Sequence, residues 1–296
     1  MNSTIAAPPL PALDSPYLIT AEQCARFERD GHLALSSVLS PQEVAACRDA
    51  IRRTVAASMN QRHALENDVG AADRNWQFVN NLWTQDEGAR HLIHARRLAR
   101  LATTLLGVDR VRLYRDQSYF KAPGGAGTPW HQDGYFIPLA TDAICTAWIP
   151  LTDMTVEASP MTYATGSHKA GFLGLSPGGE AAMRQFEARL RERGHTFETY
   201  SNLRAGDVAF HAAWTMHATY ANTAPHMREA VVVVYFADGA CVVHDPAEGT
   251  SGAPHPYVRQ IREHSRSISL PGLEDGACAD GEMVPVLYDR AWDDMP

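Results

Sequence analysis

The segment TPWHQDGYF at 128–136 places a histidine and a carboxylate two residues apart, as His131 and Asp133. On an extended strand, residues i and i+2 point to the same face, so the two side chains would converge on one point. An imidazole nitrogen and a carboxylate oxygen are both suitable ligands for a divalent metal ion. Spacing alone is weak support, because the chain contains 13 histidines and chance pairs are common.

A third ligand is expected from another strand, and the stretch 204–236 offers His211, His217 and His226. His217 opens the strand-like segment MHATY, and Arg228 leads into the apolar segment AVVVVYFA. A guanidinium so close to a buried strand is costly unless it meets an anion. Its planar fork matches a carboxylate through two parallel hydrogen bonds. A bound carboxylate is therefore a more economical interpretation than a solvent-exposed strand end.

Two histidines and one carboxylate on one face would leave half of an octahedral coordination sphere open. That arrangement is typical of non-haem Fe(II) oxygenases. Nitrogen and oxygen ligands without thiolate favour Fe(II) over a structural zinc site. His211 is the main rival to His217 for the third position, and spacing alone leaves both as candidates.

Composition excludes several other classes of protein. The 296 residues carry 26 Lys and Arg against 34 Asp and Glu, a net charge of −8. This balance argues against a nucleic-acid or anionic-membrane partner, because both favour a surplus of basic residues. The apolar runs are too short to span a bilayer. Five cysteines with wide spacings and no CxxC motif favour a reducing, cytoplasmic location over a disulfide framework.

The residues from 20 to 107 are predicted to be mainly helical. Thr20 and Ser40 are placed as N-caps, and Glu43 stands three residues after Ser40, as in a capping box. Gly31 and Gly107, the last residue of the region, are typical of helix C-termini. The expected helices span 21–30, 41–59 and 88–106.

From residue 108 onward the pattern changes to short segments rich in Val, Tyr, Phe and Trp, separated by Gly, Pro, Asn or Asp. Such segments are typical of a β-sandwich or barrel. A charged amphipathic helix at 180–193 interrupts them and is predicted to be a surface insertion. The expected strands span 109–116, 117–123, 145–153, 208–214, 216–222 and 228–236.

The ordered landmarks of the chain resemble those of the phytanoyl-CoA dioxygenase family of Fe(II)- and 2-oxoglutarate-dependent oxygenases. They are FERDG, RLYRDQSYFKAP, PWHQD, AWIPL, GSH, AGDVAFH, and His217 followed eleven residues later by Arg228. The likeness runs from about residue 27 to about residue 239. In the family pattern the first histidine of FHxxxxxH is not a ligand, so the resemblance assigns His211 a hydrogen-bonded core position.

The resemblance implies a role for each matched residue, with Fe(II), 2-oxoglutarate and O2 as the reactive groups. His131, Asp133 and His217 match the iron ligands, and Arg228 matches the partner of the distal carboxylate of 2-oxoglutarate. Thr219 matches a hydroxyl position that assists this arginine. The remaining candidate contacts to the cosubstrate are Trp148, Lys121 and Gln117.

The implied reaction is hydroxylation, or another oxidation, of an unactivated C–H bond, with release of succinate and CO2. Related halogenases have a small residue in place of Asp133, so this carboxylate favours hydroxylation over halogenation. The surrounding aromatic residues favour a small metabolite or natural-product intermediate, and the net negative charge argues against an anionic coenzyme A thioester. The motifs predict no oligomeric state. The candidate substrate contacts are Phe78, Trp83, Tyr135, Phe136 and Trp214.

The sequence therefore predicts one domain, mainly β with flanking α-helices, around a double-stranded β-helix (the jelly roll of cupin-like proteins). The expected parts are a loose arm at 1–19, helical support at 20–107, the core at 108–240 with a helical insertion near 170–205, and an irregular tail at 241–296. Two alternatives keep this fold. One is a cupin-type metalloenzyme that does not use 2-oxoglutarate, and the other is an inactive small-molecule-binding protein.

Overall fold

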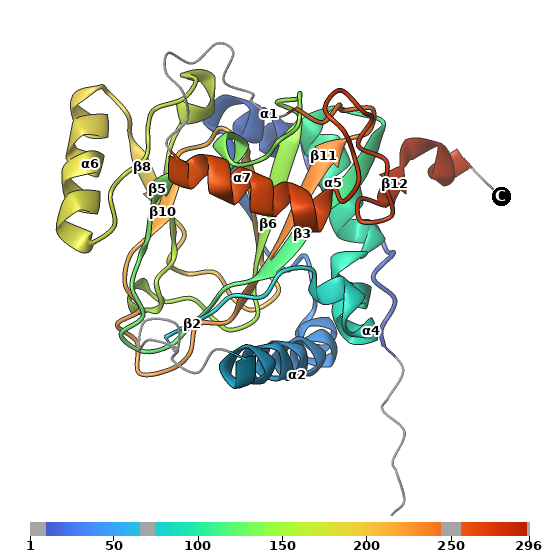
Figure 1. Cartoon of the computed structure of the whole chain (residues 1–296), viewed down its shortest axis with the longest axis horizontal. Helices are drawn as coiled ribbons and strands as arrows, with labels where there is room; N and C mark the ends of the chain where they lie inside the picture. The colour runs from blue at the N-terminus through green and yellow to red at the C-terminus, as the bar shows by residue number, and fades with distance from the viewer. Residues whose placement is uncertain (1–9, 66–74, 244–255, 295–296) are drawn as a thin grey trace, which may run out of the picture.

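The computed structural model describes residues 10–65, 75–243 and 256–294, and its core consists of two facing antiparallel sheets (Figure 1). The larger sheet follows the order β1 (His32–Leu35), β9 (Val208–Ala212), β6 (Ile144–Pro150), β11 (Ala230–Ala237), β3 (Arg110–Ser118), β12 (Val286–Asp289). The smaller sheet follows the order β5 (Thr128–His131), β10 (His217–Thr219), β7 (Met161–Ala164), β8 (Phe197–Thr199). This arrangement confirms the predicted jelly-roll fold. The short strands β2 (Trp76–Gln77) and β4 (Phe120–Lys121) pair separately.

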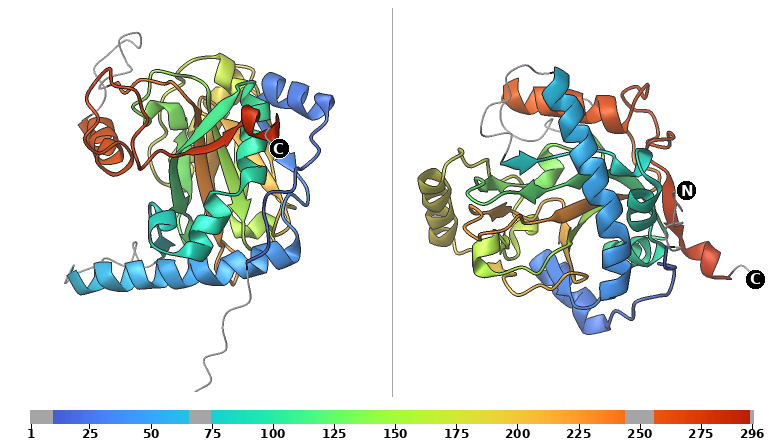
Figure 2. Two further views of the ribbon diagram at one scale, coloured as in Figure 1. Left: turned by 90° about the vertical axis from the view of Figure 1, so that its right-hand side faces the viewer. Right: turned by 90° about the horizontal axis from the view of Figure 1, so that it is seen from below.

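Helices cover the outer face of the larger sheet, and Figure 2 shows α2 running beneath the strands. They are α1 (Ala21–Asp30), α2 (Pro41–Leu65), α4 (Glu87–Ile93) and α5 (Arg96–Leu106). Ser40 and Glu43 form the predicted capping box, since each backbone N–H donates to the other's side chain. The single helix predicted over 88–106 was wrong, because the chain breaks between α4 and α5.

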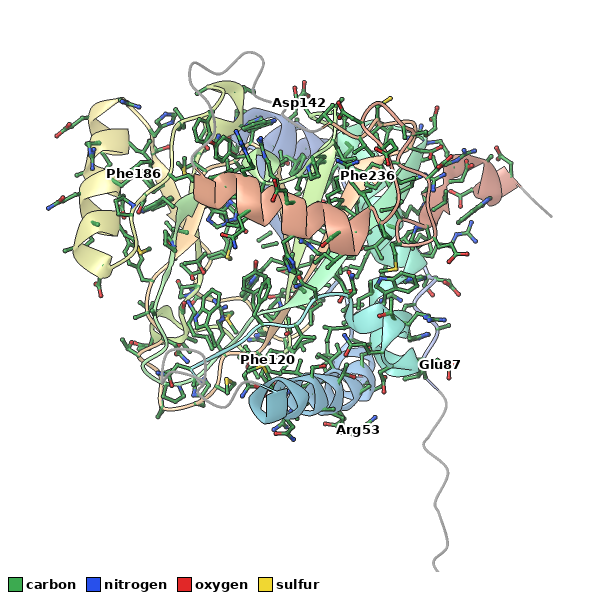
Figure 3. All side chains as sticks on the ribbon, in the orientation of Figure 1. Arg53, Glu87, Phe120, Asp142, Phe186 and Phe236 are labelled. Atoms are coloured by element: carbon green, nitrogen blue, oxygen red, sulfur yellow. The ribbon has the colours of Figure 1, made fainter. Side chains whose placement is uncertain are left out.

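The strand β11 shows how the sheet separates two apolar layers. Val231 and Val233 pack with the helices, whereas Val232, Val234 and Phe236 pack in the space between the sheets. This alternation follows from the two-residue period of a strand. The side chains of this second layer are buried, and Figure 3 labels Phe236 among them.

One row of residues on the inner face of the larger sheet is mostly polar. Strand register places His32 opposite His211, His211 opposite Thr146, Thr146 opposite Val234, and Val234 opposite Arg115. Polar side chains at buried positions need hydrogen-bond partners. The row therefore marks the level of the barrel at which polar groups are concentrated.

The C-terminal region forms regular structure where an irregular tail was predicted, so that prediction was wrong for residues 256–294. The helix α7 (Pro256–Ser269) crosses in front of the barrel (Figure 1), and β12 extends the larger sheet beside β3. Arg115 of β3 donates to Ser265 of α7, and Arg262 of α7 donates to the carbonyl of Tyr135. The inward face of α7 is largely polar, which weakens the apolar periodicity that identifies a helix.

The N-terminal arm was also predicted incorrectly where the structure describes it. Leu13 is buried, and its carbonyl accepts a hydrogen bond from the backbone of Arg97 in α5. Residues 1–9 of the predicted arm lie outside the described residues. The inserted helix is confirmed as α6 (Glu180–Glu192), at the edge of the molecule beside the smaller sheet (Figure 1). No described helix has the length and apolar character needed to cross a membrane.

Candidate active site

The smaller sheet and the turn that follows it bring the three predicted ligands together. His131 ends β5, His217 begins β10, and the two residues are paired across these strands. Asp133 begins η2 (Asp133–Tyr135), a single 3-10 turn. The ligand atoms of the three side chains all lie within 4.8 Å of one another.

His131 and Asp133 converge by a different route from the predicted one, because Asp133 lies beyond the end of the strand. Gln132 between them keeps an extended backbone (φ −125°, ψ 124°), so its neighbours still point to one side. The Gln132 side chain is fully buried and donates to the carbonyls of Gly171 and Trp214 at 2.9 and 2.7 Å. These bonds anchor the turn to two loops.

Both imidazoles present Nε2 to the centre of the site. Nδ1 of His131 lies 2.7 Å from the carbonyl of Pro129, and Nδ1 of His217 lies 2.9 Å from the carbonyl of Thr215. Because a carbonyl only accepts, each Nδ1 carries the proton and each Nε2 presents a lone pair. The two Nε2 atoms lie 3.6 and 3.7 Å from Oδ1 of Asp133. Two nitrogens and one oxygen therefore fit a divalent metal ion.

The second oxygen of Asp133 is bound by the larger sheet. Oδ2 accepts from Thr146 Oγ1 at 2.8 Å and from His211 Nε2 at 3.1 Å. Burial alone would raise the pKa of Asp133, but the surrounding imidazoles of His217, His131 and His211 hold that pKa well below its usual value. The structure thus places His211 against a predicted ligand, outside the set of three.

The guanidinium of Arg228 is buried beside β11 without an acidic partner among the described residues. It is 1% exposed, and its Nη atoms donate to the carbonyls of Ser159 and Tyr119 at 2.8 and 3.2 Å. Its Nε is buried and has no hydrogen-bond partner. Burial lowers the pKa of Arg228 to about 10. The group therefore fits an added anion.

Lys121 is a second buried basic side chain at the same place. Its backbone exchanges two hydrogen bonds of 2.9 Å with that of Arg228. Its Nζ lies 2.9 Å from the hydroxyls of Ser159 and Thr219, and it forms no ion pair with any described residue. Burial, and then the charge of Arg228, lower the pKa of Lys121 to about 5. A charged guanidinium beside an amine that would take up a proton next to an anion suits a ligand with a carboxylate group.

Glu229, the residue after Arg228, points to the opposite side of the chain. It is 4% exposed, and its carboxylate lies 2.7 Å from Nε of Arg48 in α2 and 3.5 Å from Nε of Arg52. Adjacent side chains on an extended segment face opposite ways. The entry to β11 is therefore attached to the helical layer on one side and to the barrel interior on the other.

The other predicted cosubstrate residues lie near Arg228 and Lys121. Trp148 and Gln117 are both paired with Val232, from the strands on either side of β11. The ring centroid of Trp148 lies 5.7 Å from the guanidinium carbon of Arg228. Gln117 donates to the side chain of Asn80 at 2.7 Å. Thr219 bonds Lys121, as described above, and has no hydrogen bond to Arg228 in the described part of the chain.

Three of the predicted substrate contacts surround the η2 turn. The rings of Phe136 and His131 lie 6.2 Å apart, and Tyr135 stacks on Phe172 at 4.0 Å. Trp214 packs beneath Gly134, where an added Cβ would lie 2.8 Å from the indole ring. These contacts place aromatic surface directly beside the predicted ligands.

The two candidates from the helical half differ in position. Phe78 makes an edge contact with Tyr119 at 5.0 Å, and Tyr119 also contacts Arg228 through its carbonyl. Trp83 instead packs with the helix-side core and lies against His94 at 4.9 Å. Its position does not support the predicted contact with substrate, because the larger sheet stands between that core and the predicted ligands.

Two groups of site residues were not predicted from the sequence in these roles. Thr146 and His211 bind Asp133 because of strand register, which the sequence does not reveal. Ser159 accepts a hydrogen bond from Lys121 at its hydroxyl and one from Arg228 at its carbonyl. Its backbone adopts the left-handed region (φ 59°). Only its place before a proline distinguishes it in the sequence, so no signal identified it.

Comparison with known proteins agrees with this geometry. The sequence model of phytanoyl-CoA dioxygenase (PhyH) matches residues 27–230. The chain belongs to the phytanoyl-CoA dioxygenase family. The matched residues include the three predicted ligands, Lys121 and Arg228, and the match confirms the resemblance on which the enzyme class, an Fe(II)- and 2-oxoglutarate-dependent dioxygenase, was predicted.

Several members of this enzyme class are similar to the chain. The ectoine dioxygenase of Stutzerimonas stutzeri (strain A1501) is 28% identical over 241 residues, which cover 73% of this chain and 76% of that protein. The non-heme alpha ketoglutarate dependent carbocyclase SnoK from nogalamycin biosynthesis is 26% identical, with a TM-score of 0.69 over 93% of this chain and 100% of its own. The epimerase SnoN, solved with Fe3+, alpha ketoglutarate and nogalamycin RO, is 25% identical, with a TM-score of 0.65 over 90% and 98%.

Proposed function

We propose that this family member holds Fe(II) with His131, Asp133 and His217, and binds 2-oxoglutarate with Arg228 and Lys121. The reaction is the oxidation, by hydroxylation, of an unactivated C–H bond in a small metabolite or natural-product intermediate. The observation that carries the proposal is the buried guanidinium of Arg228, whose Nε has no partner. Burying a guanidinium without a counter-charge is costly, and a bound dicarboxylate would remove that cost. The charge of the dicarboxylate would also favour the protonated form of the neighbouring Lys121.

The residues of the chain divide the work of this reaction. Arg228 and Lys121 would bind the distal carboxylate and so fix the direction in which the cosubstrate lies. His131 and His217 keep Nε2 free because their Nδ1 protons are bound by backbone carbonyls. Bound Fe(II) and 2-oxoglutarate would activate O2 for C–H oxidation, with succinate and CO2 as co-products. The buried wall around Trp148 excludes water from the cosubstrate.

The surroundings of the ligand set support a small substrate with apolar and polar parts. Tyr135 and Phe136 offer aromatic surface beside His131. Arg115 lies on the inner face of β3 with its Nε buried and unpartnered, and so offers a polar contact. The free cysteines fit a cytoplasmic enzyme.

The first experiment tests cosubstrate binding without knowing the substrate. Purified protein is mixed with Fe(II) and 2-oxoglutarate without oxygen, and the visible charge-transfer band of the complex is recorded. We expect the band in the wild type and its loss in Arg228→Gln at the same concentrations. Arg53→Gln is the matched control, because this arginine of α2 is exposed and points away from the barrel (Figure 3). The proposal is overturned if the wild type neither shows the band nor binds 2-oxoglutarate.

The second experiment identifies the reaction. A panel of metabolites is screened for succinate release above the uncoupled rate, and each hit is analysed by mass spectrometry. Hydroxylation adds one oxygen atom to the product. A product that has lost two hydrogen atoms instead would keep the cosubstrate assignment and replace hydroxylation with desaturation or ring closure.

A further inference from the structure

The carboxylate of Asp133 is held from behind by two side chains of the larger sheet. We propose that His211 and Thr146 are positioning residues that bind Oδ2 of Asp133 and thereby reserve Oδ1 for the metal. This inference rests on the proposed function, because it assumes that Asp133 is a ligand.

The geometry separates the two oxygens of this carboxylate. Oδ2 lies 2.8 Å from Thr146 Oγ1 and 3.1 Å from His211 Nε2. Oδ1 faces Nε2 of His131 and Nε2 of His217 at 3.6 and 3.7 Å. The terminal torsion of an aspartate is soft, so a carboxylate without such donors could turn either oxygen, or both, toward a cation. Two donors on one oxygen remove that freedom.

Hydrogen-bond chemistry fixes the orientation of His211. A carboxylate that coordinates a metal only accepts hydrogen bonds, so Nε2 of His211 must carry the proton. Its Nδ1 is then an acceptor, and it lies 3.4 Å from the hydroxyl of Tyr163. Tyr163 is fully buried and stacks on His32 at 4.8 Å with an interplanar angle of 11°. The imidazole is therefore oriented from both sides.

The two donors come from a rigid part of the fold. Thr146 and His211 are directly paired across β6 and β9, and each is 1% exposed. Asp133, in contrast, lies in a single turn outside the strands. The turn fixes the backbone of Asp133, and the larger sheet adds the two hydrogen bonds that set the direction of its carboxylate. Mutation of a residue that hydrogen-bonds a metal ligand in this way commonly lowers metal affinity by about 10- to 100-fold.

Two matched pairs of variants separate the hydrogen bonds from the packing. His211→Leu removes the donor to Oδ2, whereas His211→Gln keeps an amide N–H at a similar reach. Thr146→Val removes the hydroxyl at nearly constant volume, whereas Thr146→Ser keeps it. The melting temperature of each metal-free variant verifies that it folds. The probes are Co(II), titrated into metal-free protein, and the anaerobic band with Fe(II) and 2-oxoglutarate.

We expect His211→Leu and Thr146→Val each to weaken Co(II) binding by about 10- to 100-fold and to shift the band. His211→Gln and Thr146→Ser should bind Co(II) close to the wild type. Wild-type affinity in both His211→Leu and Thr146→Val overturns the inference. Equal weakening in His211→Gln and His211→Leu also overturns it, since packing would then be the cause. A wild type that binds neither Co(II) nor 2-oxoglutarate overturns this inference and the proposed function together.

Discussion

The two ends of the proposed site differ in how their charges are balanced. At the metal end, one carboxylate lies among three imidazoles and all its oxygens have polar neighbours. At the cosubstrate end, Lys121 and Arg228 lie side by side, and no acidic side chain of the described residues pairs with them. The charges of the first end are balanced by neighbouring side chains, whereas the second would be stabilised by a bound anion.

The largest effect is expected from Asp133→Ala, which breaks the metal end alone. It should abolish metal binding and succinate formation, because it removes the only carboxylate of the ligand set. Weak binding of 2-oxoglutarate to the metal-free protein should persist, since Arg228 and Lys121 both remain. Calorimetry without metal measures that binding, and Asp49→Ala on the exposed side of α2 is the control. Succinate formation at the wild-type rate would contradict the assignment.

Arg228→Leu breaks the other end. Losing charge-assisted hydrogen bonds of about 1.5–3 kcal/mol should raise the Kd of 2-oxoglutarate by ~10- to 150-fold. Metal affinity measured without 2-oxoglutarate should be unchanged, because Arg228 is not part of the ligand set. An unchanged Kd would mean that groups other than Arg228 hold 2-oxoglutarate, and activity that survives this substitution would favour the cupin-type enzyme that does not use it.

Lys121→Met tests the cosubstrate end through the pH dependence of the free energy of unfolding. Burial lowers the pKa of Lys121 from 10.5 to about 5, so the unfolded chain binds a proton that the ligand-free folded protein does not. The free energy of unfolding of the wild type should therefore rise as pH increases between these two values. Lys121→Met should remove this contribution, and urea unfolding at several pH values measures it. Parallel profiles for the two proteins would contradict the prediction.

Gly134→Ala tests how tightly the metal end is packed. An added Cβ would lie 2.8 Å from the indole ring of Trp214, so the turn or the ring must move. Overpacking of this kind costs about 1–3 kcal/mol, and we expect a lower melting temperature together with weaker Co(II) binding. Gly178→Ala is the control, because nothing lies within 4 Å of its added Cβ. Equal stability of the two variants would show that the turn is loosely packed.

The smallest effect is expected outside the barrel. Glu180 and Arg184 form an ion pair of 2.6 Å on α6, with side chains 55% and 63% exposed. Glu180→Gln should change the free energy of unfolding by only a few tenths of a kcal/mol, because water screens such pairs. A loss above about 1 kcal/mol in chemical unfolding would mean that α6 contributes more than an exposed insertion should.

Local spacing paired His131 with Asp133, and the family resemblance, not spacing, selected His217 over His211. The structure brings His131, Asp133 and His217 together. Local spacing could not predict that Thr146 and His211 meet Asp133, since that contact depends on the register of β6 against β9. The helix α7 was missed for a related reason. Its inward face carries polar groups whose partners lie on distant segments.

The opposite orientation of Arg228 and Glu229 gives the helical layer a mechanical connection to the cosubstrate. Arg48 of α2 forms an ion pair with Glu229 on the outer side of the barrel. Glu229 is the chain neighbour of Arg228, whose guanidinium lies inside the barrel. An anion bound to Arg228 would therefore also restrain Glu229 and its ion pair with Arg48. The backbone amides of α2 around Arg48 should then exchange hydrogen more slowly once 2-oxoglutarate is bound. Hydrogen exchange in this helix would thus measure binding inside the barrel.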